Sequence, residues 1–255
     1  MDAVVYDGSF EGLFTSIFEV YEYKLTDVKI YRQEEATQSL FGKLHVVTTS
    51  AIKAQRVYKR LKEKLSPVAM ERFYKTYLSQ LPGIEDYLLR YIQYSLSSKM
   101  PVENNYSNPD ILMVHQTSRK VDREKHRMEA FVRFQKTKDD LYYSIIQPDY
   151  NVLPLISKHF KDRYADQLWL IYDATRKYGL YYNLTSVEEV ELQFDIDQNN
   201  KQQLASIHDE KEELYQQLWQ QYFSSVNIAA RKNMKLHIQH MPKRYWKHLT
   251  EKKLS

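Results

Sequence analysis

Four side chains in the middle of the chain have the chemistry of a metal site or of an acid–base pair. His126 and His159 supply imidazoles, and Asp149 and Asp173 supply carboxylates. If they converge, they could bind a divalent metal ion or exchange protons with a substrate. Their spacing matches no known ligand signature, and the alternative is that they cap elements or pair at the surface. We treat these four as the candidate catalytic residues.

The second candidate site is a basic run near the C-terminus in which cations alternate with aromatic residues. Cations neutralise phosphates and an exposed Trp stacks on a base, so this pattern predicts nucleic-acid binding. The alternative is that Trp246 docks the last helix onto the core while the lysines are solvated. The predicted nucleic-acid-binding residues are Arg231, Lys232, Lys235, Lys243, Arg244, Trp246 and Lys247.

Charge is distributed unevenly along the chain, although the net charge is only +4. Residues 188–213 hold nine acidic side chains against two lysines, and residues 231–253 hold eight basic side chains against one glutamate. This asymmetry indicates a basic face for a polyanion. A pair of solvated helices that attract each other explains the same pattern equally well.

The elements that must position these residues mix helices and strands. Apolar residues at helical spacing and Ser or Ser-Pro caps predict helices from about residue 9 to 128. Alternating and β-branched runs predict strands from residue 130 onward, with one hairpin. The expected strands are 4–6, 28–31, 44–47, 130–135, 141–146, 169–172, 180–182 and 187–194. The expected helices are 9–23, 50–65, one opened by Ser66-Pro67, 84–98, 108–128, 152–164, 206–226 and one that contains Tyr245 and Trp246.

The order of these elements predicts an α+β fold rather than a doubly wound one, because they lack a regular β-α-β spacing. We expect a helical N-terminal half, a central antiparallel β-rich region and C-terminal helices. We expect residues 1–255 to form a single domain. Within it, 50–128 is the helix-rich subregion and 129–255 is the β-containing subregion.

The absence of cysteine restricts the chemistry of this chain. It excludes disulfides, thiol nucleophiles, cysteine zinc sites and an iron–sulfur cluster on cysteine. No glycine-rich phosphate loop, His-Glu-x-x-His motif or Gly-x-Ser-x-Gly elbow occurs either. No cofactor is evident from the sequence, although the four candidate residues could hold a divalent metal.

Location is predicted from the lack of apolar segments. Residues 1–7 contain no basic segment and no long apolar run, so we expect no signal peptide. No stretch approaches 18 uninterrupted apolar residues, so we expect no membrane span. These features, with the missing cysteines, predict a cytoplasmic protein that has no membrane partner.

Ten short stretches, spread over nearly the whole chain, together resemble a bacterial family of DNA metabolism or DNA repair proteins of unknown function. They are YDGSFEG (6–12), SLFG (39–42), LPGIE (81–85), HRMEAFVRF (126–134), QPDYNVLPLI (147–156), HF (159–160), DRYADQ (162–167), WLIYD (169–173), RKN (231–233) and MPKRYW (241–246). The resemblance implies a radical-SAM partner that modifies or repairs DNA. In related chains such a domain is fused to a uracil-DNA-glycosylase-like domain, for which this sequence has no room. The family supplies no catalytic residues to carry over.

Three functions are consistent with these observations, in decreasing order of support. The first is a nucleic-acid-binding accessory that presents DNA to the radical-SAM partner. The second is a metal-dependent enzyme acting on nucleic acid through His126, Asp149, His159 and Asp173. The third is a protein-interaction scaffold without direct DNA contact, in which the acidic region 188–213 and the Tyr-rich surface recognise the partner. It ranks close behind the first.

Overall fold

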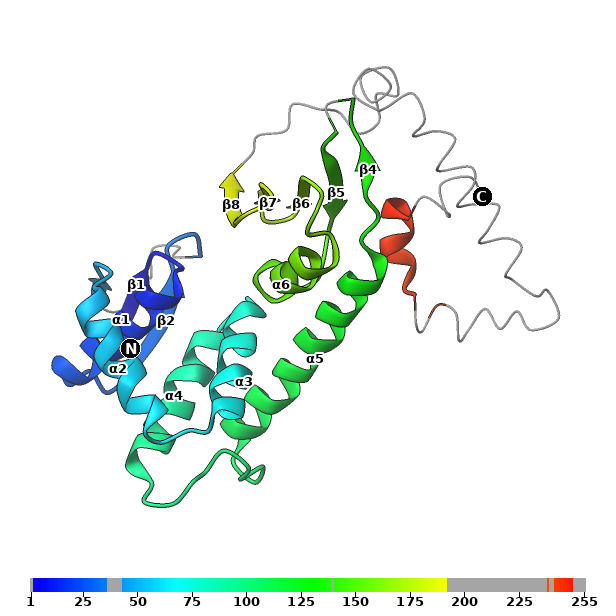
Figure 1. The fold of residues 1–255 in the computed structure, drawn as a ribbon. Helices are drawn as coiled ribbons and strands as arrows, with labels where there is room; N and C mark the ends of the chain where they lie inside the picture. Colours follow the sequence, from blue (N-terminus) through cyan, green and yellow to red (C-terminus); the bar gives the residue numbers. More distant parts are fainter. Residues whose placement is uncertain (1, 36–42, 139, 192–237, 239–240, 250–255) are drawn as a thin grey trace. The chain divides into compact units, whose positions relative to one another are not determined.

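The computed structural model describes residues 2–35, 43–138, 140–191, 238 and 241–249 (Figure 1). The chain divides into two compact units, 1–122 and 123–255, and the boundary falls inside one long helix. The mixture of helices and strands confirms the predicted α+β class and the helical N-terminal half. A single domain over 1–255 stays a prediction. None of the helices in the described ranges is long and apolar enough to cross a membrane.

The first unit is built on a three-stranded parallel sheet with the order β2-β1-β3. Val4 in the central strand pairs with Ile30 on one side and with His45 on the other. Helix α1 follows the central strand directly and packs against α2. The elements are β1 (Asp2–Tyr6), α1 (Phe10–Glu22), β2 (Val28–Arg32), β3 (Leu44–Val46), α2 (Ala51–Lys62), α3 (Pro67–Leu78), α4 (Ile84–Ser97) and the first part of α5 (Pro109–Phe131).

Helix starts in this unit follow the predicted caps. The Ser9 hydroxyl accepts a hydrogen bond from the Gly12 amide, and the Ser66 hydroxyl accepts one from the Ala69 amide. Pro67 occupies the first turn of α3, where its missing N–H costs nothing. The local sequence therefore sets where α1 and α3 begin.

The core of the first unit is apolar and aromatic, and it contains a buried polar network around Glu85. Its fully buried side chains include Leu13, Ile17 and Phe73. Within this core the Arg32 guanidinium donates to the Glu85 carboxylate over 2.8 Å, and both side chains are almost fully buried. A buried charge is tolerated only when it is paired in this way. This pair joins β2 to α4.

Gly12 lies where an added side chain would collide with neighbouring polar side chains. A Cβ on Gly12 would lie 2.2 Å from Asp7 Oδ1 and 2.9 Å from Thr49 Oγ1. Asp7 cannot move aside freely, because it accepts hydrogen bonds from the Ser9 amide, the Ser9 hydroxyl and the Thr49 hydroxyl. We expect Gly12→Ala to lower the free energy of unfolding by about 1–3 kcal/mol, the usual cost of overpacking. Urea denaturation followed by circular dichroism measures this.

The control for Gly12→Ala is Glu11→Ala, which changes the exposed neighbour in the same helical turn. We expect this variant to unfold within about 0.5 kcal/mol of the wild type, as surface substitutions do. Equal stability of the two variants would contradict the steric role of Gly12.

The second unit contains a five-stranded mixed sheet with the order β4-β5-β6-β7-β8. Three of its pairings are antiparallel, as predicted for this region, but β5 and β6 are parallel. The difference arises because α6 carries the chain back to the starting edge, which a hairpin cannot do. After the end of α5 come β4 (Gln135–Lys136), β5 (Tyr142–Ile146), α6 (Leu153–Arg163), β6 (Trp169–Asp173), β7 (Tyr178–Tyr182), β8 (Val187–Glu191) and the 3-10 helix η2 (Lys243–His248).

One predicted strand is mostly wrong. Residues 130–135 were expected to be extended, whereas α5 continues to Phe131 and only Gln135 and Lys136 form β4. The helix continues because the Val132 amide still donates to the Met128 carbonyl and both side chains are buried. Tertiary packing thus overrides the β preference of this stretch. The predicted helix 206–226 lies outside the described residues.

Candidate nucleic-acid interface

The candidate site in the second unit is organised around one buried carboxylate, Glu124 of α5. Its side chain is only 1% exposed. It accepts a hydrogen bond from the Tyr245 hydroxyl and another, over 2.9 Å, from the backbone amide of Asp149. Arg244 and Arg127 lie 3.1 Å and 3.5 Å from the same oxygen, Oε2. The Glu124 carboxylate is therefore satisfied by hydrogen-bond donors and by two guanidinium groups. It is the centre of an ordered polar cluster and not an isolated buried charge.

Glu124 joins two segments that are far apart in the sequence. Its carboxylate oxygens accept hydrogen bonds from Arg244 and Tyr245 of η2. They also accept one from the backbone amide of Asp149, in the turn after β5. Two buried side chains hold this segment in place. They are Tyr245 of η2, which is 2% exposed, and Leu249, which follows the end of η2 and is 0% exposed. Burial and the adjacent carboxylate raise the pKa of Tyr245, so its hydroxyl remains a donor at neutral pH. The C-terminal segment is therefore fixed at this point.

Trp246 is not the fully buried residue of this segment. It is half-buried, and its indole Nε1 donates to the Met241 carbonyl over 3.0 Å. The Lys243 ammonium lies 5.9 Å from the centre of the indole ring. Tyr245 takes the fully buried position, and Trp246 beside it is partly exposed.

The turn formed by Pro148 and Asp149 is held by a second guanidinium, that of Arg176. Its nitrogens donate to the Pro148 and Asp149 carbonyls, each over 3.2 Å. The same group donates to Asp173 over 2.8 Å. Asp173 is fully buried at the end of β6 and also accepts the Thr175 amide. Asp173 therefore orients the arginine that shapes the turn.

Asp149 and Arg244 form the accessible part of the site. Their side chains approach within 2.7 Å and are 47% and 40% exposed. Partial burial and the nearby charge of Glu124 raise the pKa of Asp149, although Arg244 acts in the opposite direction. Arg244 thus has one buried carboxylate partner, Glu124, and one exposed carboxylate partner, Asp149.

The four candidate catalytic residues are not brought together as a metal site. His126 is 86% exposed, and its nearest carboxylate is Glu129 at 4.0 Å. His159 packs edge-to-face against Phe160 instead. In the part of the chain that the structure describes, no three His, Asp or Glu side chains are placed to hold one metal ion. A divalent-metal cofactor stays a prediction without a site among these residues.

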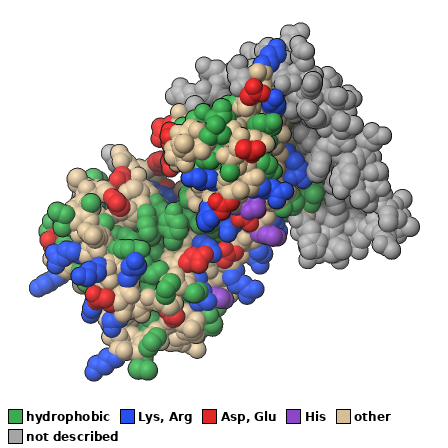
Figure 2. Space-filling model, viewed as in Figure 1, with side chains coloured by type: hydrophobic (Ala, Val, Ile, Leu, Met, Phe, Trp, Pro, Cys, Tyr) green, Lys and Arg blue, Asp and Glu red, His purple; other side chains and the backbone are tan. Residues whose placement is uncertain are grey.

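The structure describes some of the predicted basic residues but not all of them. Lys243, Arg244 and Lys247 are exposed on η2, and the Lys247 ammonium donates to the Gln147 side chain. Figure 2 shows cationic, acidic and histidine side chains intermixed on the surface over α6 and the adjoining part of α5. Arg231, Lys232 and Lys235 lie outside the described residues.

Sequence reasoning missed Glu124, Tyr245 and Arg176. For Glu124 a signal existed. Val121, Glu124 and Met128 recur at helical spacing and are all buried, so a carboxylate interrupts the apolar stripe of α5. A charge at such a position requires a specific partner. Nothing in the sequence indicated that the partner lies more than 100 residues further along.

Comparison with known proteins adds a family. Residues 82–251 match the model of DUF4130, described as a domain of unknown function. No curated protein and no solved structure matches the chain. The matched range covers more than half of the 255 residues and contains the whole polar centre around Glu124. The chain belongs to the DUF4130 family.

Proposed function

We propose that this protein binds nucleic acid through η2 and the adjoining turn, as an accessory in DNA repair or DNA metabolism. The observation that carries the proposal is the fixed presentation of cations. Tyr245 and Glu124 anchor η2, while Lys243, Arg244 and Lys247 remain exposed on it. Cations on an ordered element contact phosphates without first losing much conformational freedom.

The proposed partner is a radical-SAM protein that modifies or repairs DNA. The support is the resemblance carried by stretches such as 147–156 and 241–246, both of which belong to the polar centre. Without cysteine, this chain has no thiolates for an iron–sulfur cluster, so the cluster belongs to the partner. The role left for this chain is to bind and position the nucleic acid.

Fluorescence anisotropy with labelled single- and double-stranded DNA over a salt series tests the proposal. We expect affinity to fall linearly on a log–log plot as salt increases, because bound cations displace counterions from phosphates. Affinity without salt dependence, or no binding at low salt, would exclude it.

The scaffold function is the second candidate, and one observation favours it. Strand β8 lies at an edge of the five-stranded sheet, and its Glu188, Glu189 and Glu191 side chains are exposed. An acidic edge strand suits a basic segment of a partner protein. Co-purification with the radical-SAM partner, without retention of DNA, would favour the scaffold over the nucleic-acid-binding accessory.

Asp149 competes with a phosphate for Arg244 if the proposal is right. We expect Asp149→Asn to tighten DNA binding several-fold, since it removes the exposed negative charge beside Arg244. The backbone amide that donates to Glu124 is retained in this variant. Anisotropy measures the affinity, and a lower affinity for Asp149→Asn would contradict the competition.

The same variant has a defined effect on stability. The pKa of Asp149 is raised in the folded state, so ionisation of this side chain destabilises the fold. The protein is therefore more stable at low pH, and it loses this stability as the pH rises through the folded-state pKa. Asparagine removes this cost. We therefore expect Asp149→Asn to be at least as stable as the wild type at neutral pH, with the difference vanishing in acid.

A further inference from the structure

Helix α2 of the first unit carries a concentration of positive charge that the proposed function does not use. Its twelve residues include five cations and no acidic residue. Ala54, Val57 and Leu61 form its buried stripe. Figure 2 shows Lys and Arg side chains gathered over the region where α2 lies, at the lower left of the view. The cations are Lys53, Arg56, Lys59, Arg60 and Lys62.

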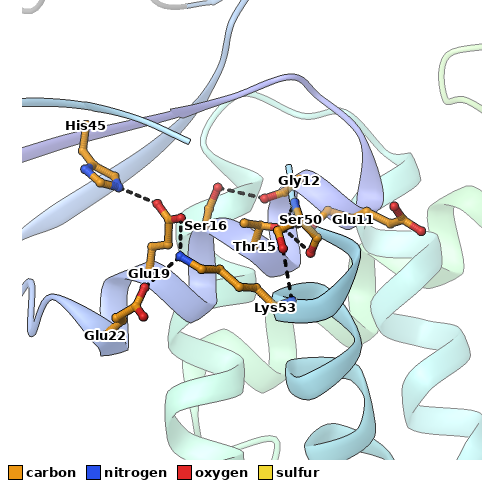
Figure 3. Close-up of polar contacts among 9 residues, drawn as sticks. All are labelled: Glu11, Gly12, Thr15, Ser16, Glu19, Glu22, His45, Ser50 and Lys53. Atoms are coloured by element: carbon orange, nitrogen blue, oxygen red, sulfur yellow. Dashed lines mark hydrogen bonds and ion pairs between the residues drawn. The ribbon is translucent and has the colours of Figure 1, made fainter. Parts of the chain in front are cut away.

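The helix is fixed to its neighbour α1 by polar contacts (Figure 3). The Ser50 amide donates to the Thr15 hydroxyl over 3.1 Å at the start of α2. One turn later the Lys53 ammonium donates to Glu19 and Glu22, each over 2.8 Å. Although burial opposes the charged form, Lys53 and His45 hold the pKa of Glu19 below its usual value. Lys53 is thus a structural cation, and α2 is held in one orientation.

The other four cations of α2 differ from Lys53 in their partners. Arg60 pairs with Glu63 over 2.7 Å. Among the described residues, Arg56, Lys59 and Lys62 form no ion pair; Arg56 lies over the Phe18 ring and Lys62 over the Tyr58 ring. All three are exposed. Three unneutralised cations on one rigid helix repel one another, and binding of a polyanion relieves this repulsion.

We propose that the face formed by Arg56, Lys59 and Lys62 is a second nucleic-acid-binding surface that contacts the phosphodiester backbone. This inference rests on the proposed function, and it assigns part of the substrate contact to a region outside the matched range 82–251. Tyr58, 38% exposed, lies beside these cations, with the Lys62 ammonium 5.0 Å from the centre of its ring.

A nucleic acid fits this surface better than a membrane does. A helix that lies in a membrane interface inserts its apolar face between lipids. In α2 that face is already in the core, because Ala54, Val57 and Leu61 are at most 9% exposed. Only Ile52 and Tyr58 remain as exposed large hydrophobic side chains of the helix. The surface therefore offers charge and one aromatic ring, but no insertion face.

The test is the triple variant Arg56→Gln/Lys59→Gln/Lys62→Gln in the full chain, assayed by anisotropy with single- and double-stranded DNA over a salt series. Glutamine preserves helix propensity, and circular dichroism checks the fold. We expect the slope of log affinity against log salt to become shallower by about 2–3, the change for three lost phosphate contacts. The matched control is Lys43→Gln/Lys99→Gln/Lys138→Gln, which removes the same charge from other exposed positions.

The outcomes separate this inference from the proposed function. Equal slopes for the triple variant and the wild type, with a loss in Lys243→Gln/Lys247→Gln, would overturn only the α2 surface. A loss in the α2 variant with no change in the η2 variant would support α2 and overturn the placement at η2. A slope change of the same size in the control would overturn the α2 assignment. A further result would also overturn the α2 assignment. In it, the wild type binds phosphatidylserine vesicles, and the α2 variant loses this vesicle binding while its DNA binding is unchanged.

Discussion

Glu124→Ala is expected to lower the free energy of unfolding by about 2–4 kcal/mol. The substitution leaves the buried Tyr245 hydroxyl and the Asp149 amide without their common acceptor, and unsatisfied buried donors of this kind cost about 1–3 kcal/mol each. Arg244 also loses its buried partner. The segment η2 should then detach from α5 before the rest of the second unit unfolds.

The measurement is urea denaturation followed by circular dichroism, with limited proteolysis to detect release of η2. Glu124→Gln should be intermediate, because its carbonyl oxygen still accepts one hydrogen bond while the charge is lost. The control is Glu129→Gln on the same helix. Within the described part of the chain, Glu129 pairs with Lys125 at 3.5 Å and His126 at 4.0 Å and with no other cation, so we expect a change within about 0.5 kcal/mol. Equal effects at both positions would show that Glu124 is not the anchor.

Lys243→Gln/Lys247→Gln is expected to weaken DNA binding by roughly 25- to 60-fold at about 0.1 M salt, relative to equal affinities extrapolated to about 1 M salt. Each lost phosphate contact reduces the salt slope by about 0.7–0.9, so the slope should fall by about 1.4–1.8. Both lysines are exposed, and neither contacts Glu124, so the fold should be retained. Arg244 is left unchanged because it also holds the polar centre.

Anisotropy over a salt series measures this effect. The matched control is Lys138→Gln/Lys158→Gln, which removes two exposed cations of the same unit; Lys158 is already paired with Asp162. We expect the control variant to retain most of the wild-type slope of log affinity against log salt. If both double variants lose the same affinity, the binding is governed by net charge and η2 is not a specific surface.

The predictions from sequence were most accurate where local chemistry decides. Ser9 and Ser66 cap α1 and α3 because a side-chain oxygen next to the first helical turn satisfies a backbone amide without any distant partner. The strand that ends in Asp173 was expected for a similar reason, since its four consecutive apolar or aromatic residues, Trp169 to Tyr172, form a short run typical of a buried strand.

The predictions were least accurate where distant segments meet. The parallel pairing of β5 and β6 depends on how α6 crosses the sheet, and no local pattern distinguishes this from a hairpin. The four candidate catalytic residues were grouped because they lie near the ends of elements. The structure separates them by function: Asp173 orients Arg176, Asp149 pairs with Arg244, and His126 lies in solvent.

The sequence by itself determined the helix starts, the mixture of helices and strands, the absence of thiol chemistry and the cations of the C-terminal run. These follow from residue type and near-neighbour spacing, which short-range hydrogen bonds and side-chain chemistry control. Only the tertiary structure decided that Glu124 is the centre of the polar cluster, that Tyr245 rather than Trp246 is fully buried, and that Arg244 pairs with one buried and one exposed carboxylate. Those relations join α5 to residues about 120 positions away. They exist only once the apolar side chains around them have been removed from water and the remaining charges must find partners.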